Sequence, residues 1–168
     1  MIIFDLDQTL IDSYSIKHLR DSRQWKLVYS KIPTIYPFEG IDYLLSTLKG
    51  RVPLGIVTSS PRTYCSRIIE HNGWEIEIVV CYHDTKKHKP HPDPILKAIE
   101  HLDSQKERVL SVGDESKDII ASNKAGVVSI AVMWGAIDRM SLLRAKPDHY
   151  FETVKELTEY VMVYFDIT

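Results

Sequence analysis

Short apolar runs alternate with longer amphipathic segments along this chain of 168 residues. Apolar runs that are bounded by turn residues are typical of buried strands, and apolar positions at helical spacing predict helices. The runs predict strands at residues 1–5, 53–57, 76–81, 109–112, 127–132 and, at an edge, 147–151. The amphipathic segments predict helices at residues 40–48, 62–72, 94–102, 119–125, 138–143 and 153–164.

Strands that alternate with helices are typical of a parallel sheet with helices on both faces. Glycines at positions 50, 73 and 126 follow three of the predicted helices, as is common at helix ends. Thr153 and Glu156 have the spacing of a capping box. We therefore expect one domain over residues 1–168, a three-layer α/β/α sandwich with a mainly parallel, Rossmann-like sheet.

The first strand leads into two carboxylates, Asp5 and Asp7. Alternate residues of a strand point to the same side, so these carboxylates should stand together at the carboxyl end of the strand. Ligands of open α/β sheets bind at that edge. Adjacent carboxylates repel each other unless a cation or a shared proton intervenes. The pair therefore predicts a site for a hard cation with oxygen ligands, such as Mg²⁺.

Polar residues also follow three other strands or begin the loops after them. Thr58 and Ser59 follow the second strand, Lys89 lies in the loop after the third, and Asp114 and Asp118 follow the fourth. Each has a simpler explanation when taken alone, as a helix cap, a turn residue or a solvated surface charge. Because a parallel sheet would collect all of them along one edge, we interpret them as one site.

These residues match, in order, four motifs of the haloacid dehalogenase superfamily. The motifs are Asp5-Leu6-Asp7-Gln8-Thr9, the Thr58 turn, the Lys89-Pro90 loop and Gly113-Asp114 with Asp118. The chain resembles the phosphohydrolases of that superfamily, and most closely the phosphoglycolate-phosphatase-like branch. The resemblance covers nearly the whole chain outside residues 13–36.

The resemblance implies a Mg²⁺-dependent phosphatase that hydrolyses a phosphomonoester through an aspartyl-phosphate on Asp5. In such an enzyme Asp7 is the general acid and base, and Lys89 neutralises the nucleophile and the phosphate. Thr58, Ser59 and Lys89 would bind the substrate phosphate. Mg²⁺ would be held by the carboxylates of Asp5 and Asp114 and the backbone carbonyl of Asp7, and Asp118 would position Lys89 or a metal-bound water.

The segment between the first two motifs is shorter than the resemblance leads us to expect. Relatives of this branch carry a helical cap there, but Thr58 follows Asp7 by only 51 positions. Residues 13–36 remain for a cap, and they predict one or two short helices. We therefore expect a reduced cap and an open site. The expected partner is a phosphorylated substrate, either a small metabolite or a larger phosphorylated molecule, and the open site suggests the larger one or a lid from another subunit.

Other functions stay open at this stage. A phosphomutase of the same superfamily and a non-catalytic phosphate-binding or interaction module are both compatible with the motifs. A dehalogenase is disfavoured, because Asp7 and a metal site have no purpose in that chemistry. Asp12 is expected to be a loop or cap residue and Glu115 to lie near the metal, and Trp134 should lie in a loop at the active edge.

The charge and composition limit the kinds of partner that we expect for this chain. The net charge of −2 predicts no nucleic-acid partner, and the chain has no apolar run of the length that would predict a membrane span. No signal peptide is recognisable, so the chain is expected to be cytoplasmic. It is also expected to be a monomer or a weak homodimer. Cys65 and Cys81 lie in separate segments and predict no metal or redox pair.

The loop that contains Lys89 also carries His83, His88 and His91. Their irregular spacing and the lysines between them disfavour a zinc site. The same positive cluster would instead help to attract a phosphorylated substrate.

Overall fold

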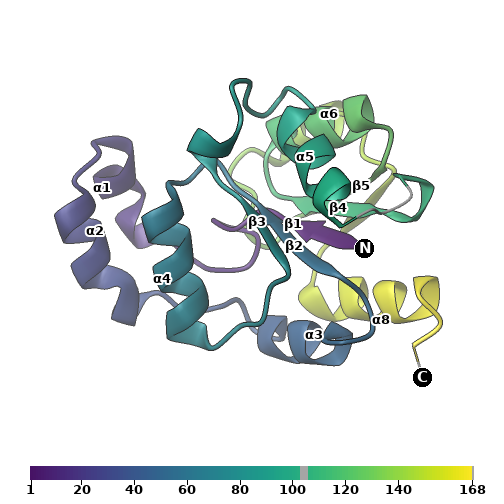
Figure 1. Ribbon diagram of the computed structural model, residues 1–168, viewed down its shortest axis with the longest axis horizontal. Coiled ribbons are helices and arrows are strands. Elements are labelled where there is room, and N and C mark those ends of the chain that lie inside the picture. Colours follow the sequence, from purple (N-terminus) through teal and green to yellow (C-terminus); the bar gives the residue numbers. More distant parts are fainter. Residues whose placement is uncertain (103–105, 168) are drawn as a thin grey trace.

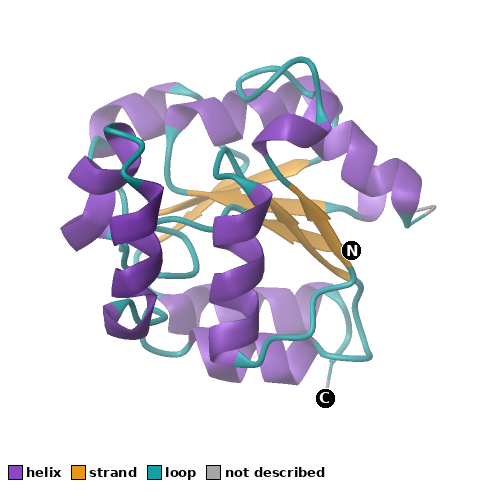
Figure 2. Ribbon diagram, turned by 60° about the vertical axis from the view of Figure 1, so that its left-hand side comes forward, coloured by secondary structure: helices purple, strands orange, loops and turns teal. Residues whose placement is uncertain are grey.

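A parallel sheet runs through the middle of the protein, between two layers of helices (Figures 1 and 2). This computed structural model describes residues 1–102 and 106–167. The strand order is β3-β2-β1-β4-β5-β6, and every neighbouring pair is parallel. All six predicted strands are confirmed: β1 (Ile2–Phe4), β2 (Leu54–Val57), β3 (Ile78–Val80), β4 (Leu110–Gly113), β5 (Val128–Val132) and β6 (His149–Phe151).

Strand β1 lies in the interior of the sheet, and the chain changes direction across it. Ile3 pairs with Gly55 of β2 on one side and with Ser111 of β4 on the other. From β1 the chain first builds outward through β2 and β3, then returns to the other side of β1 with β4. Loops at such a switch point diverge and leave a crevice at the carboxyl ends of the strands. Asp5 and Asp7 follow β1 at this position.

The two faces of the sheet bury different side chains of the same strands, since side chains alternate along a strand. Ile2 and Phe4 belong to one core cluster, whereas Ile3 belongs to the other. The first cluster includes residues of α3 (Ile41–Leu48), α4 (Arg62–Asn72) and α8 (Val154–Tyr164). The second includes residues of α5 (Asp93–His101) and α6 (Ser116–Ala125), and α7 (Arg139–Arg144) packs beside α6. The α/β/α sandwich is thus confirmed.

Local signals in the sequence set most of the helix ends. Gly73 and Gly126 end α4 and α6 in the left-handed conformation, with φ of 65° and 75°. The capping box at α8 is confirmed, because the Glu156 amide donates to Thr153 Oγ1 at 3.2 Å and the Glu156 carboxylate accepts from the Thr153 amide at 3.2 Å. Helix α6 begins at Ser116, three residues before the predicted start at position 119, so Asp118 lies in its first turn.

The segment over residues 13–36 forms short helices beside α4 (Figure 1). It contains η1 (Tyr14–Ile16), α1 (Lys17–Asp21), α2 (Trp25–Lys31) and η2 (Ile32–Thr34). The prediction of short helices in this segment agrees with these elements. Its buried residues belong to the larger core cluster, so this insertion packs on the domain instead of enclosing a core of its own. The ring centroids of Trp25 and Tyr64 of α4 are 6.2 Å apart.

Two further short helices lie in loops, η3 (Tyr82–Asp84) and η4 (Lys106–Arg108). Across the described part of the chain, none of the helices is long and apolar enough to cross a membrane.

The loop after β5 rests directly on the loop after β1, as expected for Trp134. The Trp134 indole N–H donates to the Thr9 carbonyl at 3.0 Å. A Cβ atom on Gly135 would lie 1.7 Å from the Gln8 carbonyl oxygen. Because that oxygen belongs to the main chain, it cannot rotate away as a flexible side chain would. Gly135 is therefore required by the close approach of two backbones.

We expect Gly135→Ala to lower the melting temperature more than Gly73→Ala. Gly73 has a left-handed φ of 65° but open space around it, so alanine there costs about 1–2 kcal/mol of conformational strain. At position 135 the methyl group must also push the first loop away. Thermal unfolding of the two variants measures the difference, and equal losses would contradict the contact.

Candidate functional site

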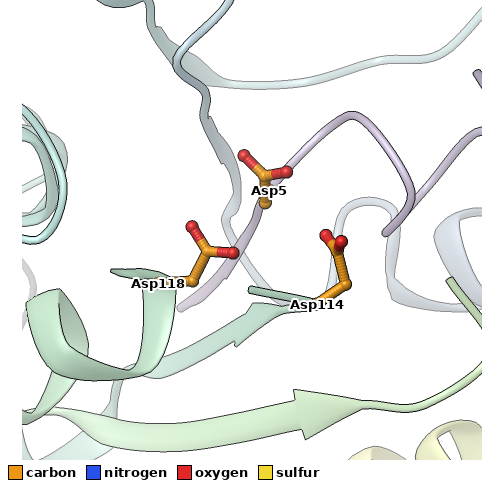
Figure 3. Close-up of side chains that lie close together, drawn as sticks. All are labelled: Asp5, Asp114 and Asp118. Atoms are coloured by element: carbon orange, nitrogen blue, oxygen red, sulfur yellow. The ribbon is translucent and has the colours of Figure 1, made fainter. Parts of the chain in front are cut away.

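Three carboxylates meet at the carboxyl end of the sheet (Figure 3). Asp5 follows β1, Asp114 follows β4, and Asp118 lies in the first turn of α6. One carboxylate oxygen from each lies within 4.8 Å of the others. The predicted proximity of Asp5 and Asp114 is thus confirmed, and Asp118 is part of the same group.

Burial and mutual repulsion make this group unfavourable without a cation. Burial raises the pKa of Asp5 to about 7, even though the Lys89 ammonium beside it lowers that value. Burial, and then the charges of Asp5 and Asp118, raise the pKa of Asp114 well above its ordinary value. One oxygen of Asp114 accepts a hydrogen bond from Thr9 Oγ1 at 2.8 Å. Clustered carboxylate oxygens are the ligands that hard divalent cations prefer, so the donor set fits such an ion.

Lys89 is the cation that the structure places among these acids. Its Nζ atom lies 2.7 Å from Asp5 Oδ1 and 2.6 Å from Asp118 Oδ1, and it donates to the Val57 carbonyl at 2.9 Å. Burial alone would lower the pKa of Lys89, but Asp118 and Asp5 outweigh it and raise that pKa above its ordinary value. With a side chain only 3% exposed, Lys89 stays charged beside Asp5. This position agrees with the roles expected of Lys89 and Asp118.

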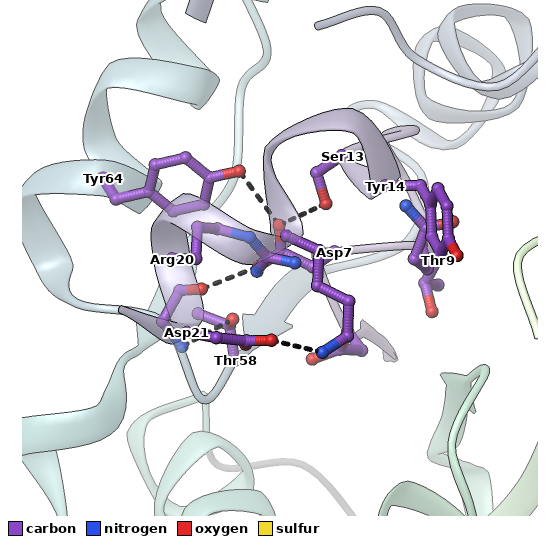
Figure 4. Close-up of polar contacts among 12 residues, drawn as sticks. Asp7, Thr9, Ser13, Tyr14, Arg20, Asp21, Thr58 and Tyr64 are labelled. Atoms are coloured by element: carbon purple, nitrogen blue, oxygen red, sulfur yellow. Dashed lines mark hydrogen bonds and ion pairs between the residues drawn. The ribbon is translucent and has the colours of Figure 1, made fainter. Parts of the chain in front are cut away.

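The Asp7 side chain points to a different set of partners (Figure 4). Its Oδ1 accepts hydrogen bonds from Ser13 Oγ at 2.7 Å and from the Tyr64 hydroxyl at 2.9 Å. Its Oδ2 accepts from Ser60 Oγ at 2.7 Å and forms an ion pair with Arg20 Nη1 at 2.6 Å. Asp7 is not a member of the three-carboxylate group, so its expected contribution to a metal site is limited to the backbone carbonyl.

Sequence reasoning missed four of the side chains that hold the carboxylates: Thr9, Ser13, Arg20 and Tyr64. Thr9 stands inside the first motif, and this was the available signal for it. Tyr64 and Arg20 lie on helices whose orientation depends on how the insertion packs against α4, which periodicity does not reveal. Burial, followed by the charge of Asp7, raises the pKa of Tyr64, so its hydroxyl remains a donor.

Thr58 and Ser59 line a cavity of about 820 Å³ together with Asp5 and Asp7. Thr58 Oγ1 accepts a hydrogen bond from the Ser60 amide at 3.0 Å. That bond stabilises the turn after β2, whereas the helix-cap role that Thr58 would have if taken alone is not seen, because Pro61 is the N-cap of α4. Helix α4 begins a few residues later, at Arg62, close to the same cavity.

The remaining candidates lie around this centre. Asp12 is a loop residue, as expected, since its Oδ1 accepts from the Tyr14 amide at 3.1 Å. Glu115 lines the cavity, but its carboxylate pairs with Lys117 at 2.6 Å and is not in the three-carboxylate group.

The histidines and cysteines have other neighbours. His88 stacks on Tyr82 with ring centroids 3.8 Å apart, and His91 Nδ1 lies 2.9 Å from Asp93. The two cysteines are distant in sequence but adjacent in space: a hydrogen bond with the Cys81 thiol, together with burial, raises the pKa of Cys65. Both thiols are free. The expectation that neither set binds a metal stays a prediction.

We expect Lys89→Met to destabilise the protein by about 3–5 kcal/mol when divalent cations are chelated, because it leaves buried carboxylates without their cation. Lys87→Met is the matched control, since Lys87 is exposed in the same loop. Urea unfolding measures the free energies. Equal midpoints for the two variants would show that Lys89 does not balance the acidic group.

The comparisons with known proteins point to one family. The family model described as haloacid dehalogenase-like hydrolase matches residues 16–132. This range begins after Asp5 and Asp7, so their place in the site comes from the first motif and the geometry.

Curated relatives are named as pyrophosphatases. A PpaX protein of Caldanaerobacter subterraneus is 36% identical over 127 residues, which cover 73% of this chain and 57% of that protein. "Pyrophosphatase PpaX" of Bacillus mycoides is 34% identical over 106 residues, covering 62% of this chain and 49% of the relative. In these two alignments the chain spans about half the length of the relatives. The protein of the same name from Oceanobacillus iheyensis is 28% identical, with 93% and 94% covered.

Solved structures share the fold. A predicted phosphoglycolate phosphatase from Haemophilus somnus has a TM-score of 0.82 at 19% identity, covering 96% of this chain and 97% of that one. A hydrolase from Pseudomonas syringae has a TM-score of 0.78 at 21% identity, with 95% and 96% covered.

Proposed function

The chain belongs to the haloacid dehalogenase-like hydrolase family, and from this premise we propose that it is a Mg²⁺-dependent hydrolase of phosphoric esters or anhydrides. The observation that carries the proposal is the convergence of Asp5, Asp114, Asp118 and Lys89 at the switch point of the sheet. The names of the relatives add inorganic pyrophosphate and 2-phosphoglycolate as candidate substrates.

Asp5 is the proposed nucleophile. Its carboxylate oxygen forms a bond to the substrate phosphorus while the bond from phosphorus to the leaving oxygen breaks, which gives an aspartyl-phosphate. Lys89, 2.7 Å from Asp5, offsets negative charge on the nucleophile and the phosphoryl oxygens. Asp114 lies beside Asp5, so a second carboxylate for a cation is close to the proposed nucleophile.

Asp7 is the proposed general acid and base. It gives a proton to the leaving oxygen and later accepts one from the water that attacks the aspartyl-phosphate and restores Asp5. Ser13, Ser60 and Tyr64 orient its carboxylate, and hydrogen bonds of 2.7–2.9 Å support that role. Thr58, Ser59 and the N-terminal end of α4 border the cavity where the substrate phosphate would bind.

A divalent cation fits the acidic group, and Mg²⁺ is the proposed ion. The carboxylates of Asp5 and Asp114 and the backbone carbonyl of Asp7 would hold it. When bound, the cation supplies charge neutralisation for the phosphoryl oxygens. Asp118 pairs with Lys89 and accepts the Glu115 amide at 3.0 Å, which supports a positioning role.

We expect Asp5→Asn to abolish the Mg²⁺-dependent hydrolysis of p-nitrophenyl phosphate, because an amide oxygen is a poor nucleophile. Asp12→Asn is the matched control: Asp12 is exposed in the same loop, and its variant should keep most of the activity. Release of p-nitrophenol measures both rates. An active Asp5→Asn enzyme would remove Asp5 from the nucleophile role.

We expect Asp114→Asn to raise the Mg²⁺ concentration for half-maximal activity by at least about tenfold. The second readout is equilibrium stability: Mg²⁺ should raise the melting temperature of the wild-type protein and leave that of the variant nearly unchanged. Equal Mg²⁺ responses in the two proteins would place the cation elsewhere.

Beryllium fluoride separates hydrolysis from the two alternatives that the motifs permit. A hydrolase should be inhibited by it in the presence of Mg²⁺ and should turn over simple phosphate esters. Tight trapping without turnover of any ester would favour a phosphate-binding module, and transfer of the phosphoryl group to a second hydroxyl would favour a phosphomutase.

A further inference from the structure

One guanidinium group of the insertion lies inside the candidate site. Arg20 of α1 places Nη1 2.6 Å from Asp7 Oδ2, and its central carbon lies 5.9 Å from the centroid of the Tyr64 ring (Figure 4). The Arg20 side chain is only 16% exposed and lines the same cavity as Asp5 and Thr58. A positive charge from outside the family motifs therefore borders the proposed reaction centre.

This guanidinium group has more N–H donors than its contact with Asp7 uses. It carries five N–H bonds in a planar fork that matches a carboxylate or a phosphate group. Within the described part of the chain, its Nε atom is buried and has no hydrogen-bond partner. Asp7 therefore does not use the whole fork, and the end of the side chain that lines the cavity has N–H groups left for an anion.

Neighbouring cations in the cavity are already matched by exposed acids of their own segments. Lys17 pairs with Asp21 at 2.6 Å, and Lys117 pairs with Glu115 at 2.6 Å. Arg20 differs because its ion-pair partner is Asp7, the proposed general acid and base. Arg20 therefore directly contacts the proposed general acid and base.

The shared partner limits where a bound anion can lie. A general acid must come within about 2.6–3.2 Å of the oxygen that it protonates. Arg20 Nη1 lies 2.6 Å from Asp7 Oδ2, and a bound anion adds one more hydrogen bond of about 2.9 Å. Measured through Asp7 Oδ2, a group bound to Arg20 therefore lies within roughly 9 Å of the scissile oxygen. An anion within a few bonds of that oxygen meets this limit.

We propose that Arg20 selects substrates whose leaving group carries a second anion, a carboxylate or a second phosphate, within a few bonds of the scissile oxygen. This inference rests on the proposed function and assigns its substrate class. It replaces the large substrate that the short insertion suggested with a small dianionic one. The fork of Arg20 binds the second anion, while Asp5 attacks the phosphorus.

Paired substrates test the selection. 2-Phosphoglycolate carries a carboxylate where 2-hydroxyethyl phosphate carries a neutral alcohol, and inorganic pyrophosphate tests the second phosphate. In Arg20→Gln, kcat/KM for the two anionic substrates should fall about 10- to 100-fold, the range of a lost charge-assisted hydrogen bond, mainly through KM. The neutral substrate should change less than threefold. The arm with the larger loss identifies the preferred anion.

Arg23→Gln is the matched control, because Arg23 is exposed at the rim of the same insertion and carries the same charge change. It should leave all three rates nearly unchanged. Arg20→Lys keeps the charge without the fork and should recover only part of the loss. An equal loss for neutral and anionic substrates in Arg20→Gln would overturn the proposal and leave Arg20 as a support for Asp7.

A binding measurement keeps the test valid if no ester is hydrolysed. With Mg²⁺ present, pyrophosphate should bind the wild-type protein at least tenfold more tightly than orthophosphate in calorimetry, and Arg20→Gln should lose this difference. Retained discrimination in a variant with a wild-type melting temperature would refute the role of Arg20. Absence of p-nitrophenyl phosphate hydrolysis would refute only the proposed function.

Discussion

One ammonium group holds the acidic end of the sheet together. Lys89 contacts the carboxylate after β1, the carbonyl at the end of β2 and the carboxylate in the first turn of α6. Carboxylates that are buried together repel each other, and an unpaired buried charge is costly. Through Lys89, the conformation of the loop after β3 therefore depends on the positions of Asp5 and Asp118. The cavity and the proposed cation site both border this pairing.

Strands β1, β2 and β4 were predictable because each is a short, largely apolar run that is fully buried. The start of α6 was less predictable. Its first turn contains Ser116, Lys117 and Asp118, which carry no apolar periodicity, and the turn is stabilised by a hydrogen bond from the Glu115 amide to Asp118. Apolar periodicity cannot locate the start of a helix whose first turn is polar. The residues that cap the helix are nevertheless visible in the sequence.

The residues of the candidate site also divide into those that the sequence predicts and those that it does not. Asp5, Asp114 and Lys89 were predictable, because strand ends in a parallel sheet share one edge whatever the side chains around them do. The partners of Asp7 were not, because Arg20 and Tyr64 reach it only through the packing of the insertion on α4. The adjacency of Cys65 and Cys81 was missed for the same reason. Contacts between helices depend on tertiary geometry, which periodicity in one segment does not contain.

The interior position of β1 has a consequence for how the protein is made. Strand β1 leaves the ribosome before its two neighbours in the sheet, which begin at Leu54 and Leu110, and before the loop with Gly135 that covers Gln8. Pairing across such long stretches of chain requires most of the sequence to be present. The nascent segment with Asp5 and Asp7 therefore emerges without the cavity that later surrounds it, and this cavity forms only late in synthesis.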